Sequence, residues 1–147
     1  MGMLQTHPGT EGIDPALDVA IMIATTATVI GDVVGVTLGT VDSTSLKWTT
    51  VDTPATADLE LGILMVAMEV VAAGAKGRFC LRGHVDVQTT SEPAVGAALY
   101  AADGATTLTD AVAGANKVWG YACELGVTGT ATRCYFDGWA GVGNDNA

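Results

Sequence analysis

Residues 77–87, GRFCLRGHVDV, alternate between apolar and polar side chains as a half-buried β-strand does. One face carries Phe79, Leu81, Val85 and Val87, and the other carries Arg78, Cys80, Arg82, His84 and Asp86. Successive strand residues point to opposite faces, so the first set is expected to face a hydrophobic core. The segment therefore predicts a strand with one buried face.

Further runs rich in β-branched or alternating residues occur on both sides of this segment. They are residues 20–24, 28–38, 46–51, 97–101, 117–126 and 130–139. The glycines inside 28–38 suggest a bulge or bend, and residues 52–58, with Pro54, are expected to form a loop. Asp103-Gly104 is a reversal signal, and Gly126 and Gly129 are two candidates for positive φ in a final hairpin.

Residues 61–71 are apolar without a period, so periodicity cannot separate helix from strand here. Leucine, methionine, alanine and glutamate favour a helix, whereas the flanking Gly62 and Gly74 and the neighbouring strands favour a strand. We interpret the segment as a strand. The wider apolar run 61–75 contains Glu69 and is too short to span a bilayer about 30 Å thick.

Some eight short strands, turn signals every 8–12 residues and no amphipathic helix predict an all-β fold. We expect a single compact β-barrel, β-tulip or β-sandwich domain. It would comprise residues 18–140, with an extended N-terminal arm at 1–17 and a short polar tail at 141–147. The arm is polar and is broken by prolines and glycines, and Leu4 and Ile13 are its few apolar residues.

The 147 residues carry six Lys and Arg against sixteen Asp and Glu, a formal net charge of −10. Such an acidic chain repels phosphate backbones, so nucleic acid is not expected as a partner. The start of the sequence lacks the features of a signal peptide, and no membrane association is expected. Only 15% of the residues are charged, against about a quarter in a usual globular chain, which suggests that a subunit or a larger assembly covers part of the surface.

The sequence shows no catalytic pattern, and we expect that the protein is not an enzyme and has no cofactor. Cys80, Cys123 and Cys134 match no zinc or redox spacing, and each is expected to be a small buried residue in a strand. His7 and His84 lie too far apart in sequence to suggest a metal site or an acid–base pair. For His84 we expect solvent exposure or a cross-strand hydrogen bond. A reducing cytoplasm is the simplest site of folding.

Three tryptophans stand out in a chain that is only 5% aromatic: Trp48, Trp119 and Trp139. Core packing is the ordinary role of such residues. Tryptophan also contributes strongly when it is fully desolvated against a partner. Trp139 follows Asp137-Gly138 near the terminus and is the most favoured of the three to face another chain. The candidate interface residues are Leu4, Ile13, Trp48 and Trp139.

Several short motifs follow the polar arm in a fixed order. Each motif alone is common, and only their order supports a resemblance to a known family. They are VIGDVV at 29–34, AGAKGRFCLRG at 73–83, GAALYAADG at 96–104 and VWGYA at 118–122. The layout over residues 20–140 resembles that of bacteriophage capsid decoration proteins, also called head-stabilising or cement proteins. The 17-residue arm and the apolar run 61–75 depart from it.

The resemblance implies a virion protein that is made in the host cytoplasm and binds the capsid exterior as a homotrimer. It would bridge neighbouring copies of the major capsid protein and stabilise their lattice, and no catalytic residues are implied. The arm would add a strand or clamp to the capsid surface.

Three other functions stay open. One is another virion component, namely a head fibre base, a tail tube or a tail tip. Another is a carbohydrate-binding β-sandwich with Trp48 or Trp139 as a stacking platform. A small hydrolase is the least favoured.

Overall fold

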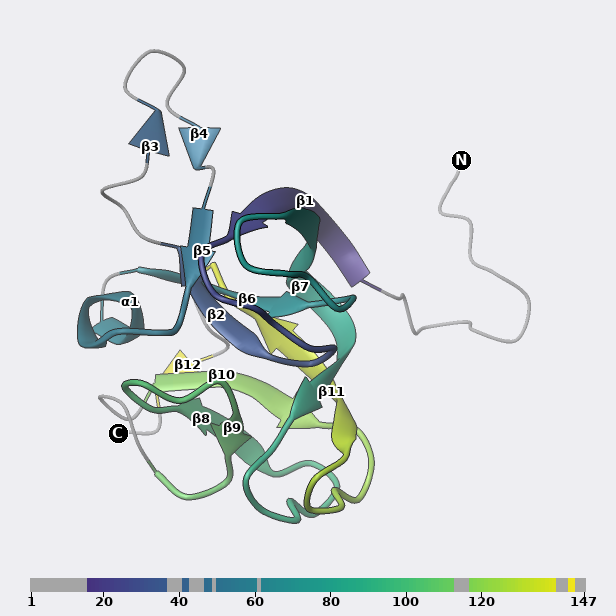
Figure 1. Cartoon of the computed structure of the whole chain (residues 1–147). Coiled ribbons are helices and arrows are strands. Elements are labelled where there is room, and N and C mark those ends of the chain that lie inside the picture. Colours follow the sequence, from purple (N-terminus) through teal and green to yellow (C-terminus); the bar gives the residue numbers. More distant parts are fainter. Residues whose placement is uncertain are drawn as a thin grey trace, which may run out of the picture.

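The computed structural model describes residues 16–36, 41–42, 47–48, 50–60, 62–112, 117–139 and 143–144. These residues form strands and one short helix (Figure 1). The elements are β1 (Ala16–Ala24), β2 (Val33–Val36), β3 (Val41–Asp42), β4 (Lys47–Trp48), β5 (Thr50–Asp52), α1 (Thr56–Glu60), β6 (Ile63–Ala67), β7 (Lys76–Gln88), β8 (Ala98–Ala101), β9 (Leu108–Thr109), β10 (Lys117–Ala122), β11 (Ala131–Asp137) and β12 (Gly143–Asn144). The all-β class is confirmed. No helix in the described ranges is long and apolar enough to cross a membrane.

Five strands close into a barrel in the order β1, β5, β2, β6, β7 and back to β1. The β1–β5 pair is parallel, and the other pairs of the ring are antiparallel. All five strands contribute side chains to the barrel core. It consists of Met22, Ala24, Val34, Val36, Val51, Ile63, Met65, Ala67, Val71 and Phe79.

The second half of the molecule is built on the end of the same long strand. Beyond the barrel, β7 pairs with β11, which continues through β10 and β8 to β9. A bridge between Thr89 and Leu108 brings the end of β7 back to β9. In Figure 1, β7 passes from the barrel in the upper part of the view towards β8, β9 and β10 below it.

A second core lies between these strands and the outer face of the barrel. It consists of Val33, Leu59, Leu64, Val66, Cys80, Val85, Val87, Leu99, Ala101, Leu108, Trp119, Ala122, Cys134 and Phe136. Strand β6 contributes Leu64 and Val66 to this core, and Ile63 and Met65 to the barrel core. Both faces of β6 are therefore buried, which explains why its sequence is apolar without alternation. The interpretation of 61–71 as a strand is confirmed for residues 63–67 only.

Strand β7 changes the direction of its side chains where it leaves the barrel. Phe79 points into the barrel core, whereas Val85 and Val87 lie in the second core. The pairing with β1 is irregular here, because Val19 pairs with Cys80 and Asp18 pairs with Arg82. This bulge leaves one residue of β7 without a partner on β1 and reverses the alternation.

The bulge also explains an error in the predicted faces of β7. The alternation predicts Cys80 on the polar face, but this residue is fully buried in the second core. Nearby, Gly83 has a φ of 128°, a conformation that residues with a Cβ rarely adopt. The sequence alternates on both sides of the bulge, so the pattern alone could not reveal it.

Other boundaries differ from the prediction. Among the described residues 28–36 the regular strand is β2, and a turn at Gly31, with φ of 90°, precedes it. The expected loop at 52–58 contains the start of α1 at Thr56. The turn at Gly104 and the positive φ at Gly129 are confirmed. The predicted positive φ at Gly126 is wrong; the reason for glycine there is space, since a Cβ would overlap Pro93.

The predicted arm falls almost wholly on residues 1–15, which lie outside the described residues. Strand β1 begins at Ala16, two residues before the predicted start of the domain. At the other end, β12 pairs Gly143 and Asn144 with β10, inside the segment predicted as a polar tail.

Candidate interaction surface

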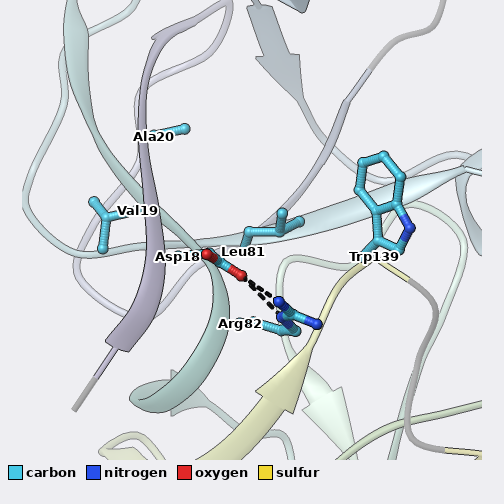
Figure 2. A pocket seen from close by; sticks show the side chains of 6 residues that line it. All are labelled: Asp18, Val19, Ala20, Leu81, Arg82 and Trp139. Carbon is cyan, nitrogen blue, oxygen red and sulfur yellow. Dashed lines mark hydrogen bonds and ion pairs between the residues drawn. The ribbon is translucent and has the colours of Figure 1, made fainter. Parts of the chain in front are cut away.

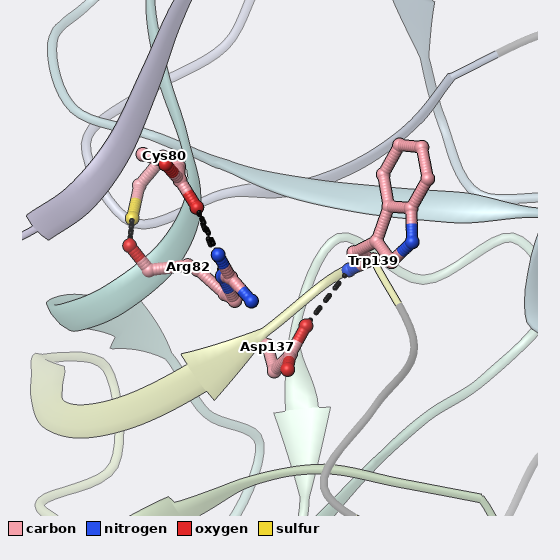
Figure 3. A network of polar contacts seen from close by, with 5 residues as sticks. Cys80, Arg82, Asp137 and Trp139 are labelled. Atoms are coloured by element: carbon pink, nitrogen blue, oxygen red, sulfur yellow. Dashed lines mark hydrogen bonds and ion pairs between the residues drawn. The ribbon is translucent and has the colours of Figure 1, made fainter.

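Trp139 is exposed, and its backbone is fixed at the junction of the two halves. Gly138 donates its N–H to the carbonyl oxygen of Leu81 on β7 at 2.8 Å, and its own oxygen accepts from Leu64 N on β6 at 2.9 Å. The Trp139 N–H donates to Asp137 Oδ1 at 3.0 Å (Figure 3). With 52% of the residue exposed, Trp139 presents an aromatic side chain from a backbone that hydrogen bonds hold in place.

A groove of about 480 Å³ runs beside this tryptophan. It is lined by Asp18, Val19, Ala20, Leu81, Arg82 and Trp139. Figure 2 shows Leu81 between the β1 residues and the indole of Trp139. Ala20 and Leu81 also pack against the barrel core, so the floor of the groove continues that core to the surface.

One ion pair forms the polar part of the groove. Asp18 Oδ2 accepts from Arg82 Nε and Nη2, each at 2.8 Å. These hydrogen bonds, followed by the charge of Asp18, raise the pKa of Arg82, and the charge of Asp137 acts in the same direction. Both side chains of the pair are nearly half exposed, so the pair contributes little to stability and remains accessible to a partner.

A smaller hollow of about 180 Å³ contains His84. Its lining is Ile30, Ala67, Met68, His84, Val85, Asp86 and Arg133. His84 lies opposite Tyr135 on the neighbouring strand, and their rings meet edge to face with centroids 5.5 Å apart. The nearby carboxylate of Asp86 pairs with Arg133 at 2.8 Å.

Two of the three cysteines are buried as expected. Burial raises the pKa of the Cys80 thiol to about 11 and that of Cys134 to about 12, so neither thiol is activated as a nucleophile. Cys123 is exposed, which contradicts the prediction; β10 ends at Ala122, so this residue lies just beyond the strand. Within the described ranges, no three or more His, Cys, Asp or Glu side chains are grouped so as to hold a metal ion.

The predicted interface residues fall in different parts of the chain. Trp139 lines the groove, whereas Trp48 pairs through its backbone with Val41 and its side chain is not described. Leu4 and Ile13 lie outside the described residues. Trp119 is fully buried in the second core, with Lys117 Nζ 4.1 Å from the centroid of its ring.

The sequence did not indicate that Val19 or Arg82 would contribute to this surface. Val19 is 46% exposed although it lies in an apolar strand, and Asp18 and Arg82 are 64 positions apart. Spacing along the sequence cannot predict this contact, because the contact depends on the pairing of β1 with β7.

Comparison with known proteins gives a likeness in fold alone. No protein-family model and no curated protein matches the sequence. Among solved structures, the crystal structure of the head fibre gp8.5 N base of bacteriophage phi29 is similar, with a TM-score of 0.57 and 17% sequence identity. The match covers 84% of this chain and 96% of that one. The shared architecture therefore extends over nearly the whole phi29 base.

Proposed function

We propose that this chain is a structural protein of a bacteriophage virion that acts by binding and not by catalysis. It attaches to the exterior of the head and stabilises the lattice of the major capsid protein as a decoration protein. The single observation that carries the proposal is the fold shared with the phi29 head fibre base over 96% of that chain. Because one fold can serve many functions, the surface of this chain has to provide independent support.

That support comes from the groove at Trp139. Backbone hydrogen bonds already hold the exposed Trp139 at this point of the chain, so binding would have to order its side chain but not its backbone. Aromatic side chains of this kind are common anchors in protein interfaces. The net charge of −10 disfavours binding to nucleic acid and favours a protein partner or solvent around the domain.

The proposed partners are the major capsid protein and further copies of this chain, arranged as a homotrimer. Many copies bound side by side would reinforce a shell through numerous weak contacts. The chain would be made in the host cytoplasm, and its buried, unpaired Cys80 and Cys134 fit a reducing compartment.

A second candidate is the base of a head fibre. It is favoured because the similar solved structure is itself the base of such a fibre. Both candidates are structural parts of the virion, and they differ in whether the domain reinforces the shell or carries a projecting fibre.

Cryo-electron microscopy of the particle that contains this protein tests both candidates. We expect density for the barrel and the second half on the outer surface of the head, in contact with the major capsid protein. A fibre that projects from this density would favour the second candidate. Density within the tail, or absence of the protein from purified particles, would refute the proposal.

A further inference from the structure

We infer that the groove at Trp139 binds an aliphatic side chain that lies next to a lysine or arginine in a segment of a protein partner. That this partner is the major capsid protein rests on the proposed function. The chemistry of the segment follows from the groove itself.

The apolar part of the groove fits an aliphatic side chain. Ala20 and Leu81 form a floor continuous with the barrel core, and Val19 and Trp139 add exposed apolar surface. An aliphatic side chain placed here would extend the core. Its gain in free energy would grow with the apolar surface removed from water.

The acidity of the whole chain favours a basic neighbour. At the groove itself Asp18 and Arg82 neutralise each other as an ion pair. The charge of Asp137 acts on both Arg82 and Lys117. The chain as a whole carries −10, so its field attracts cations. The exposed ring of Trp139 can also stack on a guanidinium or an ammonium group.

The same charges disfavour a second copy of this chain as the occupant. Each copy carries a net charge of −10, so a second copy would bring an acidic surface to the groove, whatever contacts hold the proposed homotrimer elsewhere. Residues 1–15 contain Glu11 and Asp14 and no lysine or arginine, so this segment has the wrong charge for the groove. A foreign basic segment fits better.

Two synthetic peptides test the inference on the full-length protein. One is GRIRG and the other is GEIEG, both capped at their ends, and binding is followed by NMR of the Trp139 indole and of the Val19 and Leu81 methyl groups. We expect GRIRG to shift these signals and to bind about tenfold more tightly than GEIEG, a difference that corresponds to about 1.4 kcal/mol. Equal binding of the two peptides, no binding of GRIRG, or shifts elsewhere would overturn the inference.

Single-residue variants show which side chains of the groove bind GRIRG. Trp139→Ala should abolish binding of GRIRG, whereas Leu125→Ala, which removes another strongly exposed apolar side chain, should leave it unchanged. Asp18→Asn should reduce the preference for GRIRG over GEIEG, because it removes one of the two carboxylates. Signals of Trp139 that shift with protein concentration alone would place a second copy in the groove and contradict the inference.

Binding to expanded phage heads that lack this protein separates the inference from the proposed function. If wild type and the Leu125→Ala variant bind and Trp139→Ala does not, both stand. If all three bind equally, the inference about the groove fails and the proposed function survives. If none of the three proteins binds to heads while GRIRG still binds to the wild type, the inference about the groove survives and the proposed function fails.

Discussion

The backbone of Gly138 is hydrogen-bonded to Leu64, whose N–H donates to the glycine oxygen at 2.9 Å. The N–H of Gly138 bonds in turn to Leu81 on β7 at 2.8 Å. The chain that leaves β11 is thus inserted between β6 and β7. A Cβ at Gly138 would overlap the carbonyl group of Leu64, so the junction of the two halves requires glycine at this position.

Replacing Gly138 with alanine should destabilise the protein by about 3 kcal/mol, because the backbone at this junction must shift to admit a methyl group. Gly96→Ala is the control. Gly96 has a φ of 84° with no atoms near its would-be Cβ, so backbone strain alone should cost about 1 kcal/mol. Urea unfolding measures both, and equal losses would contradict the steric role of Gly138.

Trp119 and Trp139 should differ sharply in their contribution to stability. Trp119 is fully buried and Trp139 is 52% exposed. Trp119→Ala should cost about 3–5 kcal/mol through the cavity that it leaves. Trp139→Ala should change the free energy of unfolding by only about 0.5 kcal/mol. Chemical denaturation checks the pair, and a large loss for Trp139→Ala would mean that this side chain supports the fold.

Asp58 should make the protein less stable as pH rises through the acid range. Burial raises its pKa above 3.8, the charge of Asp52 acts in the same direction, and a hydrogen bond from Ala55 N partly opposes them. Because the folded state holds the proton more tightly, the contribution of Asp58 is greatest below pH 3.8 and is lost as pH rises through the folded pKa.

Asp58→Asn keeps an acceptor for Ala55 and cannot ionise. The free energy of unfolding of this variant should therefore rise relative to that of the wild type as pH increases from about 4 to 7. Urea unfolding across this range measures the difference. Parallel pH profiles for the two proteins would show that Asp58 has the same pKa in the folded and unfolded states.

The three cysteines should react at different rates in the native protein. Cys123 is exposed, whereas Cys80 and Cys134 are buried with pKa values raised to about 11 and about 12. Iodoacetamide at pH 8 should modify Cys123 first, and all three should react in denaturant. Mass spectrometry of the digested protein resolves the sites. Rapid native labelling of Cys134 would indicate that the second core opens.

Removing residues 1–15 should leave a folded domain that no longer binds phage heads. The cut preserves β1, which begins at Ala16; a cut after residue 17 would remove the first two residues of that strand. Circular dichroism checks the fold, and co-sedimentation with expanded heads checks binding. A truncated protein that still binds as tightly as the full chain would show that the arm is dispensable.

Sequence patterns predicted the strands better than their arrangement. Alternation located β7, and turn residues such as Gly104 located its neighbours, because these signals are local. The parallel pairing of Ile23 with Thr50 and the division into two cores depend on contacts far apart in the chain. The apolar run around Leu64 was ambiguous because a strand buried on both faces loses its period.

The candidate surface was predictable only in part. Composition singled out Trp139, because an aromatic side chain next to a Gly turn near the terminus is a plausible anchor. Its neighbours Val19 and Arg82 come from strands that the bulge near Cys80 brings into register. The sequence alternates on each side of this bulge and does not show where it lies. The groove could therefore be found only from the three-dimensional structure.

The 13-residue strand β7 forms a wall of both halves. The described residues include no linker at which the two cores could separate, and disorder in one core removes the packing of the other. A single cooperative melting transition is the thermodynamic consequence. Mechanically, a load applied to one half is transmitted to the other as shear along the hydrogen-bond ladders of this strand, which resist it collectively.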